Sequence, residues 1–272
     1  MNSTTPQRTA IGIASVGHAT FAAVMIFLGV LGLIKGGFTV IWEPVPKGLP
    51  ARQALAYLST VISLVSGIGL FWRRTASLAS RILWAFLILW LLLLSIPSVF
   101  LLPLVPGTWS CGRTMVMTAA AWILFTWFAT DWDRRRLGFA VGDKGVCIAR
   151  VLYGLGLIPF GVAHFIYPQQ TAPLVPGWLP WHMFWAYFTG ATFIVAGVAV
   201  IIGVFARLAT ALSVLQMGLF GLLVWVPLIS AGTLSPFQWG EVVTTLALTA
   251  AGWVVADSYS QPLLTWRTSH TS

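Results

Sequence analysis

Apolar stretches long enough to cross a membrane alternate with short polar segments along the whole chain. An α-helix needs about 20 apolar residues to span the hydrocarbon core of a bilayer, where it satisfies its own backbone hydrogen bonds. The pattern therefore predicts eight transmembrane helices, at residues 11–34, 53–72, 78–102, 112–130, 147–167, 183–205, 208–230 and 236–256. The expected fold class is an all-α membrane protein.

The longest polar interruption lies near the middle of the chain, at residues 131–146. We expect it to be a cytoplasmic linker between a first four-helix membrane unit, residues 1–130, and a second, residues 147–257. Residues 258–272 form a short polar tail, expected in the cytoplasm. The chain thus divides into two membrane units of similar length.

The two units show the pattern of an internal repeat. When position 46 is placed over position 176, the first unit aligns with the second without a gap over two helices and their loops. Proline, tyrosine and tryptophan match at this single offset, at positions 46/176, 50/180, 57/187, 97/227, 106/236 and 109/239. Because four spans return the chain to its starting side, the units should have the same orientation, as in parallel-repeat membrane proteins. Small residues such as Ser63, Gly67, Gly190 and Gly197 would allow close helix packing.

The composition agrees with a membrane protein. Hydrophobic residues make up 58% of the chain and charged residues only 8%, against about 25% charged in soluble domains. The formal charge of +9 would favour a nucleic-acid partner in a soluble protein. Here the basic residues lie between apolar spans, so we interpret them as topology signals. The lipid bilayer, and no nucleic acid, is the expected partner.

The lysines and arginines are distributed unequally between the two sides of the predicted membrane topology. If the amino terminus is cytoplasmic, only Lys35, Lys47, Arg52 and Arg113 lie on the outer side. The inner side then holds Arg8, Arg73, Arg74, Arg81, Arg134, Arg135, Arg136, Lys144, Arg150, Arg207 and Arg267. The positive-inside rule therefore predicts that both termini and the linker are cytoplasmic. The two cysteines, at positions 111 and 147, would lie on opposite faces and form no intrachain disulfide.

Four segments of the second half resemble the DoxX-like family of bacterial four-helix membrane proteins. They are residues 150–165, 176–180, 185–191 and 206–209, and the resemblance covers about 146–256. It implies a bacterial inner-membrane location. It also implies a role beside quinone-linked electron transfer, because this family includes a membrane subunit of a thiosulfate:quinone oxidoreductase and partners of other redox systems. The first half follows the same plan more loosely.

Five polar or ionisable residues are candidates for binding a quinone headgroup near the outer end of the second unit. His164 and Tyr167 share a face of one span, His182 and Tyr187 lie at about the same level, and Glu241 begins the last span. Neutral histidine and tyrosine can donate hydrogen bonds to quinone carbonyls, and a glutamate can accept or relay a proton. In the first half Ile34 and Arg52 stand where the second has histidines, so such a site would exist once.

Structural explanations compete with this site. Aromatic residues gather at membrane interfaces without any ligand. Ser235 and Gln238 have the spacing of a capping box, so Glu241 would sit favourably near the positive end of that helix, or pair with Arg113 across the units. For His18, in the first span, a hydrogen bond to a neighbouring helix is the expected role.

Three functions agree with the sequence. The first is an accessory or anchor subunit of a quinone-linked redox complex, and we favour it. The others are a transporter of a small, mostly apolar solute, and a structural membrane protein without a ligand. No nucleotide, zinc-protease or haem-attachment motif occurs, and we assign no catalytic residue and no metal site. A stand-alone enzyme is therefore not expected.

Overall fold

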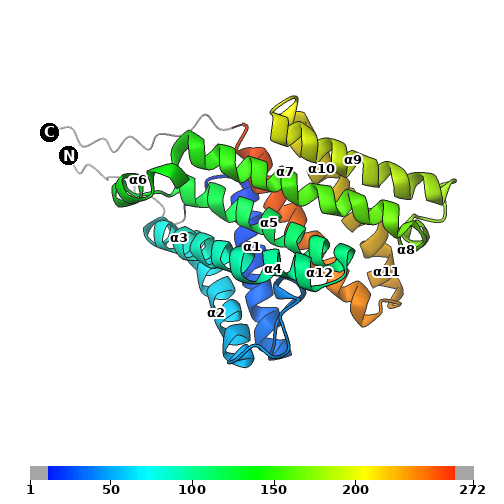
Figure 1. Cartoon of the computed structure of the whole chain (residues 1–272), viewed down its shortest axis with the longest axis horizontal. Coiled ribbons are helices and arrows are strands. Elements are labelled where there is room, and N and C mark those ends of the chain that lie inside the picture. Colours follow the sequence, from blue (N-terminus) through cyan, green and yellow to red (C-terminus); the bar gives the residue numbers. More distant parts are fainter. Residues whose placement is uncertain (1–11, 261–272) are drawn as a thin grey trace, which may run out of the picture.

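The computed structural model describes residues 12–260, and these residues form helices and connecting turns without any strand (Figure 1). The predicted all-α class is confirmed for this part of the chain. Arg8, Arg267 and His270 lie outside the described residues.

The first half contains four long helical segments. Their bounds are α1 Val16–Lys35, α2 Arg52–Leu70, α3 Arg73–Trp90 with a π-helical turn Leu91–Ser95 and α4 Ile96–Leu101, and α5 Leu104–Trp127. Helix α5 starts well before the predicted span at 112–130. A 3-10 turn, Val40–Trp42, lies in the loop after α1.

The second half repeats this order. After α6, Asp131–Arg136, and a 3-10 turn, Gly138–Ala140, its elements are α7 Gly142–Ile166, α8 Pro168–Thr171, a 3-10 turn Ala172–Leu174, α9 His182–Ile202, α10 Ala206–Phe220, a π-helical turn Gly221–Trp225, α11 Val226–Ala231 and α12 Pro236–Asp257. Helix α7 begins at Gly142, inside the segment predicted to be linker.

The π-helical turns occur at equivalent places in the two halves, separated by the same offset as the sequence repeat. Each precedes a short helix that carries a proline in its first turn, Pro97 in α4 and Pro227 in α11. A proline inside a helix lacks the N–H donor and its ring crowds the carbonyl four residues earlier. A widened turn just before the proline makes room for its ring while the helix continues. The π-helical turn is therefore the local distortion that each proline causes.

Seven helices within residues 12–260 have the length and apolar composition to cross a membrane. They are Val16–Lys35, Arg52–Leu70, Arg73–Leu101, Gly142–Ile166, His182–Ile202, Ala206–Ala231 and Pro236–Asp257. Helix α5, with 24 residues, is as long as these but more polar, and most of its side chains are buried. A helix surrounded by protein meets little lipid, so its sequence can be more polar than that of its neighbours.

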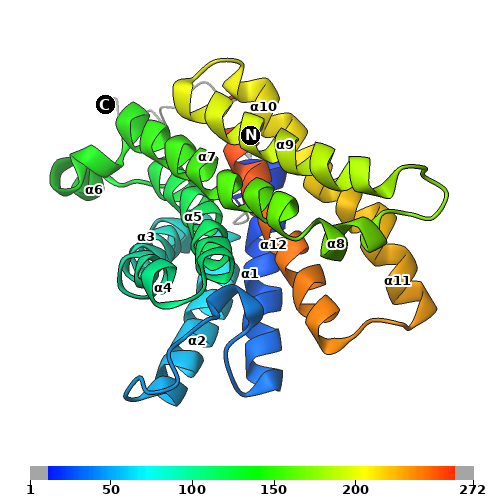
Figure 2. The same cartoon turned by 45° about the vertical axis from the view of Figure 1, so that its right-hand side comes forward.

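The two halves have equivalent packing orders (Figures 1 and 2). In the first half α1 packs on α2, α2 on α3 and α3 on α5, and in the second α7 packs on α9, α9 on α10 and α10 on α12. The halves meet where α5 lies along α7, α1 lies along α12, and α5 contacts α12. Helices α5 and α12 therefore form the centre of the molecule.

Glycines set the close approach of α7 to its neighbours. A Cβ atom on Gly154 would lie 2.7 Å from the Gly197 carbonyl oxygen on α9, and one on Gly197 would lie 2.6 Å from the Gly154 oxygen. A Cβ on Gly190 would lie 2.7 Å from the Cβ of His164. The close packing predicted for Gly190 and Gly197 is confirmed, and Gly67 lies equally close to α1.

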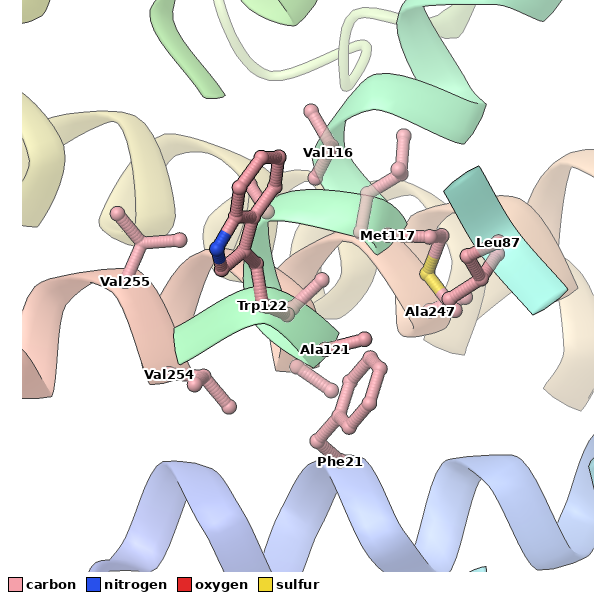
Figure 3. Packing of buried hydrophobic residues seen from close by; sticks show 14 of the residues in the cluster. Phe21, Leu87, Val116, Met117, Ala121, Trp122, Ala247, Val254 and Val255 are labelled. Atoms are coloured by element: carbon pink, nitrogen blue, oxygen red, sulfur yellow. The ribbon is translucent and has the colours of Figure 1, made fainter. Parts of the chain in front are cut away.

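The centre of the core is built around α5 (Figure 3). Its side chains Met117, Ala121 and Trp122 lie among residues of α1, α3 and α12, including Phe21 and Val254. The indole N–H of Trp122 donates to the carbonyl oxygen of residue 140 at 2.8 Å. Side chains from both halves thus share one core.

The loop between α1 and α2 is part of this core rather than a solvated connection. Phe38, Ile41 and Trp42 are buried, and the Trp42 ring packs edge-on against Phe86 and Trp90 at centroid distances of 5.3 and 5.0 Å. The proline-containing segment that follows this turn is not helical. The burial of its aromatic side chains was not predicted.

Candidate functional site

Helix α12 carries Glu241 in its second turn. The helix begins with the predicted capping box: the Ser235 hydroxyl accepts from the Gln238 N–H at 3.3 Å, and the Gln238 side chain accepts from the Ser235 N–H at 2.9 Å. This start fixes the rotation of the helix. The Glu241 carboxylate then lies within electrostatic range of the Arg113 guanidinium on α5, although the two groups form no direct ion pair.

Arg113 is the buried cation of this site, with 7% of its surface exposed. Its Nη2 donates to the Glu43 carbonyl oxygen at 2.9 Å, and the Ser110 hydroxyl donates to the same oxygen at 3.0 Å. The Glu43 side chain also interacts electrostatically with Arg113 and forms an ion pair with Lys35 at 3.6 Å. Within the described residues Arg113 Nε has no hydrogen-bond partner. The site therefore holds a guanidinium whose Nε–H has no partner, within electrostatic range of two carboxylates.

The chain contains only two glutamates, and both lie near this arginine. Glu43 comes from the loop after α1 and Glu241 from α12, so the two halves of the chain contribute opposite sides of the cluster. A buried charge is costly unless a partner of opposite sign compensates it. The proximity of Arg113 to Glu241 had been considered from the sequence, but the part played by Glu43 had not. A single arginine in an otherwise apolar helix was the signal for this site.

The structure places the candidate histidines and tyrosines around the connection between the end of α7 and the first turns of α9. His164 Nδ1 lies 2.7 Å from the Phe160 carbonyl oxygen of its own helix. Tyr167 ends α7, His182 begins α9, and Tyr187 is partly exposed. Among the described residues, no hydrogen bond or ion pair joins any two of these four side chains or links one of them to Glu241.

A row of aromatic rings leads from His164 toward the buried arginine. The His164 ring lies 5.9 Å from Phe193, Phe193 lies 6.2 Å from Phe160, and Phe160 lies 5.0 Å from Trp109. Trp109 precedes Ser110 on α5, one turn before Arg113. The row of contacting rings thus extends from His164 to helix α5, which also carries Arg113.

His18 has the structural role expected for it. Its Nε2 lies 3.1 Å from the Leu70 carbonyl oxygen on α2, and its Nδ1 accepts from the Ala14 N–H at 3.1 Å. These contacts fit a neutral ring with the proton on Nε2. In the described part of the chain no group of three or more histidine, cysteine or acidic residues could hold a metal ion.

No family model, curated protein or solved structure matches this chain. The chemistry that this chain can support therefore follows from the site itself. A buried guanidinium with a free donor, within electrostatic range of a carboxylate and on the same helix as the last ring of the aromatic row, can hydrogen-bond a carbonyl or an anionic oxygen of an apolar ligand.

Proposed function

We propose that this protein is a DoxX-like inner-membrane protein of bacterial type that serves as an accessory or anchor subunit in quinone-linked redox chemistry. The observation that carries the proposal is the buried Arg113 guanidinium, whose Nε has no partner among the described residues and whose nearest charges are glutamates from both halves. A charged group at membrane depth is a functional-site hypothesis by default.

In this proposal the protein crosses the membrane eight times as two parallel four-helix units, with α5 as the eighth span. Three features support it: equivalent elements that recur at the offset of the sequence repeat, equivalent packing orders, and the length and burial of α5. The pairs α5–α7 and α12–α1 are then equivalent contacts about an axis between α5 and α12. The distribution of lysine and arginine places both termini in the cytoplasm.

The proposed ligand is a quinone headgroup at the outer end of the second unit. Arg113 would donate a hydrogen bond to one carbonyl oxygen, and Glu241 would accept or relay a proton beside it. The ring of the ligand would stack in the row formed by Trp109, Phe160 and Phe193, with His164 as a second donor. Tyr167 and Tyr187, which are exposed, and His182, which is half-buried, would form the rim through which the ligand enters.

Mass spectrometry of the protein purified from native membranes in mild detergent tests this function. The wild type is expected to retain a quinone and a redox-enzyme partner, and Glu241→Gln and Arg113→Gln are expected to lose the quinone. Arg74→Gln is the matched control, because Arg74 is an exposed arginine in the first turn of α3 and does not belong to this cluster. Equal elution on size exclusion verifies folding. If the purified wild type retains only bulk phospholipid, the proposal is excluded.

A further inference from the structure

A groove lies at the end of the molecule opposite the proposed quinone site, between the α9–α10 turn and the end of α12. Its volume is about 580 Å³, and its lining includes Phe205, Arg207, Leu208, Ala211 and Tyr259. This turn joins two membrane-spanning helices, so the groove is at a membrane surface. Phe205 adopts a φ of 49° and is 79% exposed, which directs an aromatic side chain outward at this level.

The equivalent position in the first half carries a charged side chain. Arg81 occupies the position on α3 that Ala211 occupies on α10 when the two halves are aligned by the repeat. The Arg81 guanidinium pairs with Asp133 of α6 at 2.7 Å and lies 5.0 Å from the Trp132 ring centroid. Ala211 has no such side chain, and the counterparts of α6 by the same offset, residues 261–266, lie outside the described residues.

The lining of the groove combines a cation with apolar surface. Arg207 is exposed and forms no ion pair among the described residues, and no acidic side chain lines the groove. Burial raises the pKa of the Tyr259 phenol, whose hydroxyl is hydrogen-bonded to Thr210 of α10. A second cation, Arg150, lies 3.7 Å from the Tyr259 ring centroid. This combination complements an anionic headgroup.

An apolar stripe leads away from the groove along one face of α10. Its members recur every three or four residues and are all exposed: Leu208, Leu212, Leu215, Leu219 and Leu222. Such a stripe extends from the membrane surface toward the bilayer centre, the path of an acyl chain.

We infer that this groove binds one anionic phospholipid. The phosphodiester would accept hydrogen bonds from Arg207 in the groove that Tyr259 lines, and one acyl chain would lie along the leucine stripe of α10. Basic pockets between transmembrane helices at a membrane surface are suited to anionic headgroups. The inference is independent of the quinone proposal, because the two sites share no residue.

Native mass spectrometry of the full-length protein tests this site. The protein is titrated with phosphatidylglycerol and, in parallel, with phosphatidylcholine of identical acyl chains. We expect the first phosphatidylglycerol to bind about fivefold more tightly, the contribution of one arginine near a membrane surface. Arg207→Gln and Ala211→Phe should both abolish this preference, the first by removing the charge and the second by filling the groove.

Arg74→Gln is the matched control, because Arg74 is an exposed arginine in the first turn of α3 and should leave the preference intact. The inference would be overturned if the wild type showed no preference for phosphatidylglycerol over phosphatidylcholine. It would also be overturned if the Arg207→Gln variant kept that preference. A third arm adds inorganic phosphate in millimolar excess. Loss of the lipid preference in that arm would assign the site to free phosphate and would also overturn the phospholipid inference.

Discussion

Replacing Asp133 should destabilise the contact between α6 and α3. The Asp133 side chain is fully buried and the Arg81 side chain is 31% exposed. The carboxylate accepts from Arg81 Nη2 at 2.8 Å, from the Thr130 N–H at 2.8 Å and from the Thr130 hydroxyl at 2.6 Å, and it pairs with Arg81 Nε at 2.7 Å. One side chain thus compensates a cation at the end of a membrane-spanning helix and caps α6.

The size of the effect follows from these contacts. Hydrogen bonds to a charged group contribute about 1.5–3 kcal/mol, and a partly exposed arginine keeps some hydration when its partner is lost. Asp133→Asn keeps the size of the side chain and should cost about 2 kcal/mol of the free energy of unfolding. Asp133→Ala also removes the helix cap, worth about 1 kcal/mol, and should cost about 3 kcal/mol.

Reversible unfolding in detergent micelles, followed by the fluorescence of the 15 tryptophans, measures these differences. Asp131→Asn is the matched control, because Asp131 is exposed in the first turn of the same helix. It should cost less than about 1 kcal/mol, the usual range of a charge at a helix end. If Asp133→Asn is no more destabilising than Asp131→Asn, the reasoning about this pair is wrong.

The Asp133 contact should also depend on pH. Burial alone would raise the pKa of Asp133, but the hydrogen bonds from Arg81 and Thr130 and the charge of Arg81 lower it below the ordinary value. A carboxyl with a lowered pKa in the folded state stabilises above its unfolded pKa, about 3.9. That contribution disappears as the pH falls through the lower folded pKa. The stability difference between wild type and Asp133→Asn should therefore shrink below about pH 4 and stay constant between pH 5 and 7.

Two further predictions concern helix packing and orientation. Gly197→Ala should cost about 1–3 kcal/mol of unfolding free energy because its Cβ would lie 2.6 Å from the carbonyl oxygen of Gly154. Gly218→Ala, whose Cβ would meet nothing closer than 3.9 Å, should be neutral or stabilising in the same denaturation assay. A membrane-impermeant maleimide should label exposed Cys147 and not buried Cys111, and only in inside-out vesicles. Labelling in intact cells would contradict the proposed orientation.

Much of the fold follows from the length of the apolar stretches. Each helix that is long and apolar enough to cross a membrane lies at a predicted span, because backbone hydrogen bonding in lipid leaves few alternatives. The capping box at Ser235 and the close contacts of Gly190 and Gly197 were also predictable, since both depend on local sequence. The early start of α5 was missed because a central helix shielded from lipid carries polar residues and glycines.

Contacts between distant segments were harder to predict. The pairing of Arg81 with Asp133 joins two separate helices, and Arg81 had been treated only as a topology signal. The packing of Trp42 against Phe86 and Trp90 is of the same kind, because it joins the loop after α1 to a separate helix. At the candidate site, Arg113 had been considered as an outer-side charge and as a partner for Glu241, because nothing local to its sequence reveals the contact with the Glu43 carbonyl.

Equilibrium binding of a short-tailed quinone to the protein reconstituted in nanodiscs tests the central claim most directly. The wild type should bind one quinone per chain above the partitioning seen in protein-free nanodiscs. Glu241→Gln and Arg113→Gln should raise Kd about tenfold or more, because a hydrogen bond to a charged group contributes about 1.5–3 kcal/mol. Arg74→Gln should bind like the wild type. Unchanged affinity in Glu241→Gln and Arg113→Gln, or uptake by the wild type no greater than by empty nanodiscs, would contradict the assignment of this site.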